Sequence, residues 1–338
     1  MATIRIGIIG AGGVARGQTT TFREQPDVEV VAIAEPSNKS LEAFKEAVYP
    51  DDGLPAVYRS HVEMLDNESL DGVLIASPHS VHFVQIIDSL EAGVHVLSEK
   101  PLVCSTDETI EVIKKTRHVG REIVIGYQRR FSSQYRYMKR FVQSPEFGDI
   151  RCVFAFQSQQ WLSSQKGKWR QNPALSCGGQ LNDSASHLID ILFWIIDDRV
   201  TDVSAIIDNR GTEVDIDSAV SFRTQKGTIG TLSIMGSATA TGINEDITIN
   251  GDGGRSLFLR SGELSMNTSL DEPLIEVTNF DGCKDGNKVL HFLDVVRGRT
   301  RNESPPESFL PVIEFTEACW ESAAQGGTPV AVKETATS

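Results

Sequence analysis

A glycine-rich turn near the N-terminus limits most strongly what this chain can fold into. The apolar run Ile4–Ile9 has the β-branched residues of a buried strand and leads directly into Gly10-Ala11-Gly12-Gly13-Val14-Ala15. In this spacing Gly10 permits a tight turn, Gly12 lets the backbone approach a pyrophosphate, and Ala15 lets the next helix pack closely on the strand. A lone turn of this kind also occurs in chains that bind no nucleotide, so its meaning depends on the residues downstream of it.

An acidic residue stands where a dinucleotide-binding turn needs one. Glu35 comes directly after the second apolar run, Val28–Ala34, twenty positions after Ala15. A carboxylate at this place can accept hydrogen bonds from the adenosine ribose hydroxyls, and it would repel a ribose 2′-phosphate. We therefore expect the N-terminal part to bind a nicotinamide dinucleotide, with NAD favoured. NADP is left open, because the polar run 37–39 comes next. The residues expected at the cofactor here are Gly10, Ala11, Gly12, Gly13, Val14 and Glu35, with Ser37, Asn38 and Lys39 as the alternative 2′-phosphate ligands.

The first third of the chain alternates apolar runs with helical segments. Further strand-like runs lie at 72–76, 94–98 and 122–126, and helices are expected between the runs. One helix opens with the capping box Ser105-x-x-Glu108 and ends at Gly120. This alternation predicts repeated βα units, so we expect residues 1–125 to form an α/β Rossmann domain with a parallel sheet.

The pattern changes after about residue 126. Arg151–Gln159 alternates apolar and polar residues, and 203–266 is typical of successive strands without long helices. Turn residues at 251–254 predict a hairpin, and a helix at 309–324 precedes a final strand at 329–332. We expect residues 126–338 to form an α+β domain with a large, mostly antiparallel open sheet.

Composition argues against several classes of partner. The chain has 338 residues, with 32 Lys and Arg against 46 Asp and Glu, a formal charge of -14. Such a surface repels phosphate backbones and anionic lipids, so we expect no nucleic-acid and no membrane partner. No signal peptide or membrane span is apparent. The five cysteines are scattered, odd in number and without a Cys-x-x-Cys pair, which indicates free thiols and a cytoplasmic location.

Lys100 is the first candidate for chemistry. It lies just after the run 94–98 within Glu99-Lys100-Pro101, at the carboxyl end of a parallel strand, where doubly wound sheets bind ligands. A lysine there can donate a hydrogen bond to a substrate oxygen that changes between alcohol and carbonyl. Taken alone, a lysine is more often a solvated surface charge.

Asp183 and His187 form a second candidate. Their i, i+4 spacing would place both on one face at the start of a helix whose apolar stripe begins at Leu188. The unperturbed pKa of histidine suits proton transfer near neutrality, so His187 is our candidate general base. The pair would also fit a helix-terminal acid beside a buried histidine, or half of a metal site. No further Cys or His stands at a matching spacing, so we expect no metal.

The ordered motifs resemble those of the Gfo/Idh/MocA oxidoreductases, the family of glucose–fructose oxidoreductase and inositol dehydrogenase. The likeness spans nearly the whole chain, although Gln180 stands where the family often has a third glycine and His79 where it often has asparagine. The motifs that carry it are the glycine turn, Ser77-Pro78-x-x-x-His82, Glu99-Lys100-Pro101, Trp169-Arg170, Gly178-Gly179-x-x-x-Asp183-x-x-x-His187 and Gly327-x-Pro329-Val330.

The resemblance implies an NAD(P)-dependent dehydrogenase acting on a secondary alcohol of a sugar, cyclitol or polyol, in a cleft between the domains. It implies that Asp183 orients the substrate hydroxyl and that the peptide before Pro101 is cis. Glu99 is interpreted as a cofactor-ribose or structural contact. The further cofactor contacts expected are Ser77, Pro78, His82, Glu99, Lys100, Gln128, Trp169 and Arg170. The substrate contacts expected are Lys100, Tyr127, Trp161, Asp183 and His187, with Trp161 equally suited to a core position.

Two other functions fit the same residues. Some relatives keep NAD bound and oxidise a sugar only transiently, during glycosidic cleavage, elimination or epimerisation. A regulator that senses the cofactor without catalysis is a further alternative. Because relatives commonly associate through the C-terminal sheet, we expect a homodimer or homotetramer.

Overall fold

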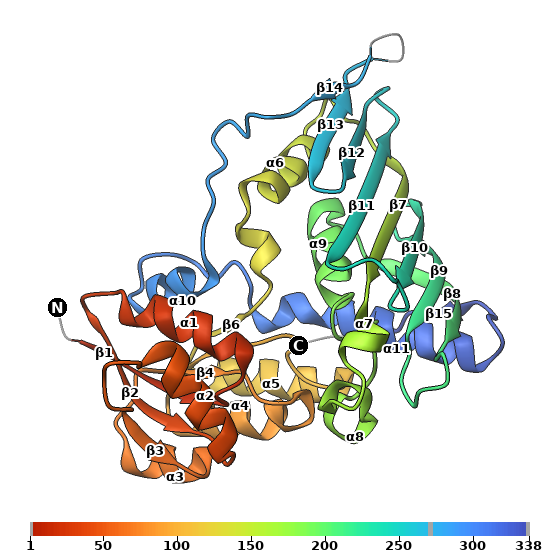
Figure 1. Ribbon diagram of the computed structural model, residues 1–338. Helices are drawn as coiled ribbons and strands as arrows, with labels where there is room; N and C mark the ends of the chain where they lie inside the picture. The colour runs from red at the N-terminus through yellow and green to blue at the C-terminus, as the bar shows by residue number, and fades with distance from the viewer. Residues whose placement is uncertain (1–2, 270–272, 336–338) are drawn as a thin grey trace. The chain divides into compact units, whose positions relative to one another are not determined.

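The computed structural model describes residues 3–269 and 273–335, which form two compact units (Figure 1). Unit 1 comprises residues 3–127 and 286–307, and unit 2 the described residues from 128 to 285 and from 308 on. The expected division near residue 125 left everything after it in one domain, whereas 286–307 belong to unit 1. There the helix α10 (Lys288–Val296) packs against α1, with Phe292 and Phe22 edge to face at 6.3 Å between ring centroids. No local sequence pattern predicts that residues 286–307 pack in unit 1, because the contacts of this segment are with residues far away along the chain.

Unit 1 is built on a six-stranded parallel sheet in the order β3-β2-β1-β4-β5-β6. This order and the intervening helices confirm the Rossmann fold. The strands are β1 (Ile4–Ile9), β2 (Val28–Ala34), β3 (Ala56–Tyr58), β4 (Gly72–Ile75), β5 (His95–Ser98) and β6 (Ile123–Ile125). The helices are α1 (Gly13–Arg23), α2 (Asn38–Val48), α3 (His61–Asn67), α4 (His82–Glu91) and α5 (Thr106–Val119).

Local sequence chemistry accounts for most boundaries in unit 1. Ser105 Oγ accepts the Glu108 N–H at 3.2 Å, Glu108 Oε2 accepts the Cys104 N–H at 2.8 Å, and α5 ends at Gly120 with φ +63°. The strand β3 was not predicted, because it has only three residues and two of them are exposed.

Unit 2 is built on a nine-stranded sheet in the order β14-β13-β12-β11-β7-β10-β9-β8-β15. Every neighbouring pair is antiparallel except β7 and β10, so the expected mostly antiparallel sheet is confirmed. The strands are β7 (Ile150–Gln159), β8 (Val200–Asp208), β9 (Asp217–Thr224), β10 (Ile229–Met235), β11 (Ile243–Gly251), β12 (Ser256–Arg260), β13 (Glu263–Asn267), β14 (Ile275–Glu276) and β15 (Val330–Ala331). The helices are α6 (Ser133–Val142), α7 (Trp161–Ser164), α8 (Pro173–Ser176), α9 (Ser186–Ile196) and α11 (Leu310–Ala324).

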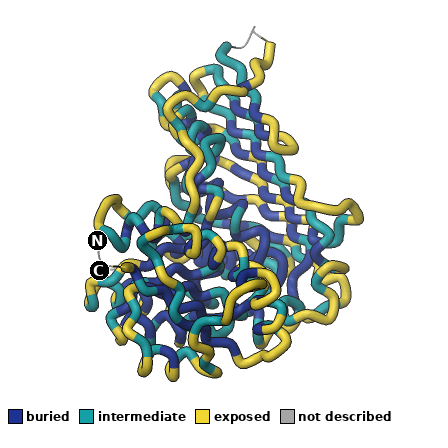
Figure 2. Tube along the Cα trace, turned by 60° about the vertical axis from the view of Figure 1, so that its left-hand side comes forward, coloured by how far each residue is buried: buried dark blue, intermediate teal, exposed yellow. Residues whose placement is uncertain are grey.

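One face of the nine-stranded sheet is covered and the other is open. The helices α9 and α11 pack on the covered face, where Phe193, Phe222 and Phe315 meet edge to face. Along β10, Leu232 and Ile234 are buried, whereas Ile229 and Met235 on the other face are 49% and 44% exposed. Figure 2 shows buried and exposed residues alternating along these strands, as expected for a sheet with a one-sided core.

Cys152, Cys283 and Cys319 are free thiols, as expected. The same expectation is wrong for Cys104 and Cys177, each of which is disulfide-bonded. Within residues 3–269 and 273–335, no helix has the length and apolar character needed to cross a bilayer.

Candidate active site

The glycine-rich turn connects β1 to α1 and leaves open space at the N-terminus of α1. Gly10 has φ +91°, and a Cβ there would lie 2.8 Å from the Ser77 nitrogen, so only glycine lets the ends of β1 and β4 approach. Gly12 is the N-cap of α1 and provides no side chain to bond the first helical N–H groups. A Cβ on Gly13 would meet nothing within 4 Å. A diphosphate fits here, because unpaired N–H groups at a helix N-terminus bind anions.

Glu35 lies beside this turn. Its Oε2 accepts the Ala11 N–H and its Oε1 accepts the Ser37 N–H, each at 2.8 Å, and the residue is 8% exposed. Each carboxylate oxygen can accept a second hydrogen bond, which suits ribose hydroxyls. The Arg59 guanidinium donates to Pro36 O at 3.0 Å and to Asn38 Oδ1 at 2.6 Å. A cation therefore stands next to the loop after Glu35. Arg59 was not predicted as a site residue.

Residues 77–82 end β4 and begin α4. Ser77 donates its hydroxyl to Gln85 Oε1 at 2.6 Å, and His79 is buried in the turn that precedes α4. The fully buried His82 ring lies between two carbonyl oxygens, with Nδ1 2.9 Å from Pro101 O and Nε2 3.0 Å from Ser77 O. The buried His82 ring therefore connects the loop after β4 to the loop after β5. Burial lowers the pKa of His82, although both carbonyl groups oppose that shift.

Lys100 is half-buried in the loop after β5, and its peptide with Pro101 is cis, as expected. The neighbouring Glu99 carboxylate is bonded to Gln18 of α1 and to Lys288 of α10. Burial raises the pKa of Glu99, but Lys288, Gln18 and Lys100 outweigh burial and hold it below its usual range. Glu99 is therefore an ionised link between three segments of unit 1. Lys288 was not predicted from the sequence, because it lies 189 residues from Glu99 along the chain.

In unit 2, the Asp183 carboxylate contacts two other predicted site residues, Trp161 and Arg170. Its Oδ2 accepts the Trp161 indole N–H at 2.8 Å and lies 3.0 Å from Arg170 Nε. Trp161 is only 1% exposed, and the Arg170 guanidinium stacks on Trp169 at 4.3 Å from the ring centroid. The expectation that Asp183 stands within a helix is wrong, because α9 begins at Ser186 and Asp183 occupies the turn before it.

His187 stands in the first turn of α9 and is half-buried. The apolar stripe expected behind it is confirmed, since the four predicted side chains are buried, namely Leu188, Ile191, Leu192 and Ile195. Near the boundary of the units, Tyr127 is buried in unit 1 and the exposed Gln128 opens unit 2. The predicted residues thus form two groups, one in each unit.

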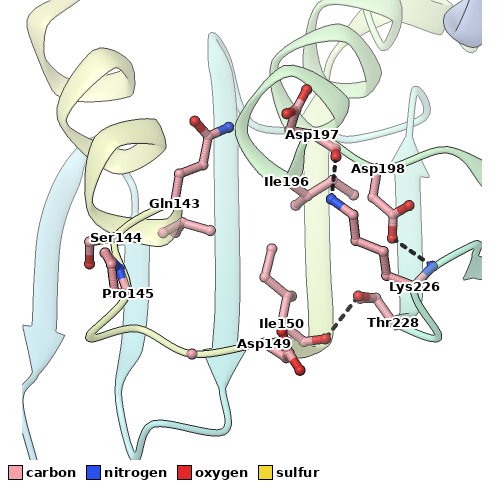
Figure 3. A pocket seen from close by; sticks show the side chains of 12 residues that line it. Gln143, Ser144, Pro145, Asp149, Ile150, Ile196, Asp197, Asp198, Lys226 and Thr228 are labelled. Atoms are coloured by element: carbon pink, nitrogen blue, oxygen red, sulfur yellow. Dashed lines mark hydrogen bonds between the residues drawn. The ribbon is translucent and has the colours of Figure 1, made fainter.

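The cavity shown in Figure 3 lies away from these residues. It has a volume of about 460 Å³ and is lined by residues of unit 2 such as Asp149, Asp197 and Lys226. Its polar groups pair with one another: Lys226 Nζ donates to Asp197 O at 2.8 Å, and Thr228 Oγ1 donates to Ile150 O at 2.9 Å. Within the part of the chain that the structure describes, no three His, Cys, Asp or Glu side chains form a metal site.

Comparison with known families defines the class of protein. Residues 4–127 match the oxidoreductase family with an NAD-binding Rossmann fold, and residues 135–256 match the GFO/IDH/MocA C-terminal domain. Both matches are to domains of one family of oxidoreductases with an NAD-binding Rossmann fold. The protein therefore belongs to the GFO/IDH/MocA family.

Curated relatives include several dehydrogenases. The chain is 27% identical over 204 residues to 1-carboxy-3-chloro-3,4-dihydroxycyclo hexa-1,5-diene dehydrogenase of Comamonas testosteroni, covering 60% of this chain and 50% of that protein. It is 25% identical over 211 residues to inositol 2-dehydrogenase/D-chiro-inositol 3-dehydrogenase of Halalkalibacterium halodurans, covering 60% and 55%. The chain thus spans about half the length of these relatives.

Solved structures share the fold over nearly the whole chain. The oxidoreductase domain protein from Kribbella flavida has a TM-score of 0.86 at 19% identity, covering 99% of this chain and 100% of that one. The WlbA dehydrogenase from Chromobactrium violaceum, solved with NADH and UDP-GlcNAcA, has a TM-score of 0.83 at 22% identity, covering 99% and 98%.

Proposed function

We propose that this protein is an NAD-dependent dehydrogenase that oxidises a secondary alcohol of a sugar or cyclitol. The observation that carries the proposal is the position of Lys100 directly after β5, in the same unit as a helix N-terminus open to a diphosphate. Ligands of doubly wound sheets bind at this edge. The substrate class is supported by relatives that include inositol dehydrogenases and a glucose-6-phosphate 3-dehydrogenase of Bacillus subtilis, 26% identical over 57% of this chain and 54% of that protein.

The proposed roles come from the chemistry of each side chain. Bound NAD supplies the hydride acceptor. His187 takes the proton of the substrate hydroxyl, and Lys100 donates a hydrogen bond to the same oxygen as it becomes a carbonyl. Asp183, whose carboxylate is held by Trp161 and Arg170, orients the hydroxyl as an acceptor.

NAD is proposed over NADP on account of Glu35. Its carboxylate is fixed by two backbone N–H groups, and a fixed anion there repels a ribose 2′-phosphate. Arg59 beside the next loop would favour that phosphate, so the preference is a balance of two charges.

A substrate panel tests the function directly. Purified protein with NAD would be offered myo-inositol, D-glucose, D-glucose 6-phosphate and levoglucosan, with NADH absorbance as the readout. We expect turnover with at least one compound, and about 10³-fold lower kcat in Lys100→Ala and in His187→Ala. The exposed Lys114 and His118 give matched controls, since Lys114→Ala and His118→Ala should leave kcat unchanged.

Other outcomes would favour the alternatives. Product formed with less than one equivalent of NAD, and without net NADH, would replace the dehydrogenase by a redox-neutral enzyme. NAD binding without turnover on a wide panel would point to a sensor. Unchanged kcat in both alanine variants would remove the proposed roles of Lys100 and His187.

We also propose that the open face of the nine-stranded sheet joins copies of the chain. It exposes the apolar side chains Phe154, Ile206 and Ile229 on neighbouring strands, and such a surface is typical of interfaces. Light scattering should give a dimer or tetramer, and the double substitution of Phe154→Asp and Ile206→Asp should shift it towards monomer. A monomer in the unchanged protein would contradict the proposal.

A further inference from the structure

Three consecutive backbone N–H groups before α9 bind to a single residue, Asp215. Gly179 donates to Asp215 Oδ1 at 2.9 Å, and Leu181 donates to Asp215 Oδ2 at 2.6 Å. Between them, the Gln180 N–H donates to the backbone oxygen of Asp215 at 2.8 Å. Asp215 is buried, and its Oδ1 also accepts the Trp320 indole N–H of α11 at 3.1 Å. Both carboxylate oxygens are therefore occupied by donors from fixed elements.

The two glycines in this loop let it pack closely on two residues, Asp215 and Trp320. A Cβ on Gly179 would lie 1.9 Å from the backbone oxygen of Asp215, which no side chain can satisfy without a backbone shift. Gly178 has φ +146°, and a Cβ there would lie 2.6 Å from the Trp320 ring. The loop thus lies directly on Asp215 and Trp320, at a distance that only glycine permits.

The anchored loop continues into the proposed catalytic residues. The Asp183 N–H donates to Gly179 O at 2.9 Å, and the Ala185 N–H donates to Gln180 O at 3.0 Å. Ala185 is in turn the N-cap of α9, in whose first turn His187 stands. Any displacement of Gly179 and Gln180 is therefore transmitted through two hydrogen bonds to Asp183 and to the start of α9.

We propose that Asp215 is a positioning residue that fixes the turn carrying Asp183 and the start of α9 carrying His187. The inference rests on the proposed function for its catalytic consequence, but the anchor itself is a property of unit 2. The two side-chain oxygens of Asp215 accept three N–H groups, two from the loop and one from Trp320 of α11, so this residue ties the loop to α11. Replacing the carboxyl group by an amide places an N–H group opposite another N–H donor, so the loop should loosen while the fold is kept.

The matched variants are Asp215→Asn and Asp217→Asn. Asp217 lies two residues further on, and its carboxylate accepts the Ser237 N–H at 3.0 Å and the Ser237 hydroxyl at 2.7 Å instead of the N–H groups of the loop. Hydrogen exchange measured by mass spectrometry should show peptides from 177–185 exchanging about tenfold faster in D215N and unchanged in D217N. No ligand is needed, so this arm reports on the anchor even if the proposed dehydrogenase activity is absent.

Turnover supplies the second arm. With the panel compound that gives the highest rate, D215N should lower kcat about tenfold. KM and the Kd for NAD should stay within about twofold of the unchanged protein, because the cofactor residues of unit 1 are untouched. A merely structural role would lower the melting temperature without this split between kcat and KM.

Three results would overturn the proposal. These are unchanged exchange of 177–185 in D215N, equal acceleration in D217N, and unchanged kcat despite a loosened loop. If D215N does not fold, Trp320→Phe removes one N–H donor at similar size and should accelerate exchange of the same segment about threefold. Unchanged exchange in W320F would then overturn the anchor.

Discussion

Gly12 and Gly13 of the first glycine-rich loop differ from Gly178 and Gly179 of the second in what surrounds them. In the first loop, Gly12 and Gly13 leave space: a Cβ on Gly12 would reach only Ala76 O at 3.8 Å, and a Cβ on Gly13 would meet nothing within 4 Å. In the second loop the space beside Gly179 is already filled by the backbone of Asp215, at 1.9 Å from a Cβ. Gly12 and Gly13 thus leave open space at the start of α1, whereas Gly179, like Gly10 at the start of the first loop, is packed on the protein's own backbone.

The contrast shows how far a glycine motif can be interpreted from sequence. The first loop is defined locally, since β1, the turn and α1 are consecutive along the chain. The second depends on Asp215, 36 residues from Gly179, and on Trp320 of α11, which lies 105 residues beyond Asp215. Glycines kept open for a ligand should tolerate substitution in the empty protein, and glycines packed on their own backbone should not.

The strongest predicted change is in the stability of the second loop. Gly179→Ala forces the Asp215 backbone or the loop to move, which should destabilise unit 2 by about 3 kcal/mol. For a unit of this size, that corresponds to a melting temperature lower by about 10 °C, measured by calorimetry. The control is Gly13→Ala, which adds a methyl group in open space at the start of α1 and should change stability by less than about 1 kcal/mol. Equal losses in the two variants would remove the distinction between the loops.

The next prediction concerns ligand binding at the first loop. Gly12→Ala meets no protein atom closer than 3.8 Å, so the ligand-free protein should melt within about 2 °C of the unchanged one. The added methyl group should nevertheless keep a pyrophosphate from the backbone and weaken NAD binding about 30-fold. Titration calorimetry with NAD measures the change. A large loss of melting temperature with unchanged NAD affinity would mean that Gly12 serves the fold and not the cofactor.

The same contrast explains which features could be predicted from the sequence. The strands β1 and β2, the turn at Gly10 and the capping box at Ser105 depend on residues close together along the chain, and the structure has them where they were expected. The segment 286–307, Lys288 and Asp215 were missed, because their partners are distant in sequence and no local pattern marks them. Asp183 was placed in a helix because the i, i+4 spacing is equally compatible with a turn that only leads into one.

A third, smaller effect concerns the preference for NAD that we propose for Glu35. Glu35→Ser removes the anion that opposes a 2′-phosphate, while Arg59 stays beside the next loop. The ratio of kcat/KM for NADP over that for NAD should therefore rise about tenfold. Adding Arg59→Ala should reverse most of that gain, since the cation that would hold the phosphate is lost. A ratio that stays constant in both variants would show that the discrimination lies elsewhere.

The weakest predicted change distinguishes the two regions by pH. Burial lowers the pKa of His82 despite the carbonyls of Pro101 and Ser77, so the unfolded chain takes up a proton on this ring at a higher pH, near about 6.5, than the folded protein does. Stability should fall as the pH drops below about 6.5. His82→Gln should therefore lose less stability than the unchanged protein as the pH drops below about 6.5.

Asp215 should show the opposite sign. Burial raises the pKa of Asp215 despite the N–H groups of Leu181 and Gly179 and the Trp320 indole, so the folded state binds its proton more tightly than the unfolded chain. Its contribution to stability is full below the unfolded value near about pH 4 and is lost as the pH rises through the folded pKa. Urea midpoints at several pH values should therefore show the stability difference between the unchanged protein and D215N growing as the pH falls, whereas the difference from H82Q shrinks. If both stability differences changed in the same direction, the opposite pKa shifts of His82 and Asp215 would be contradicted.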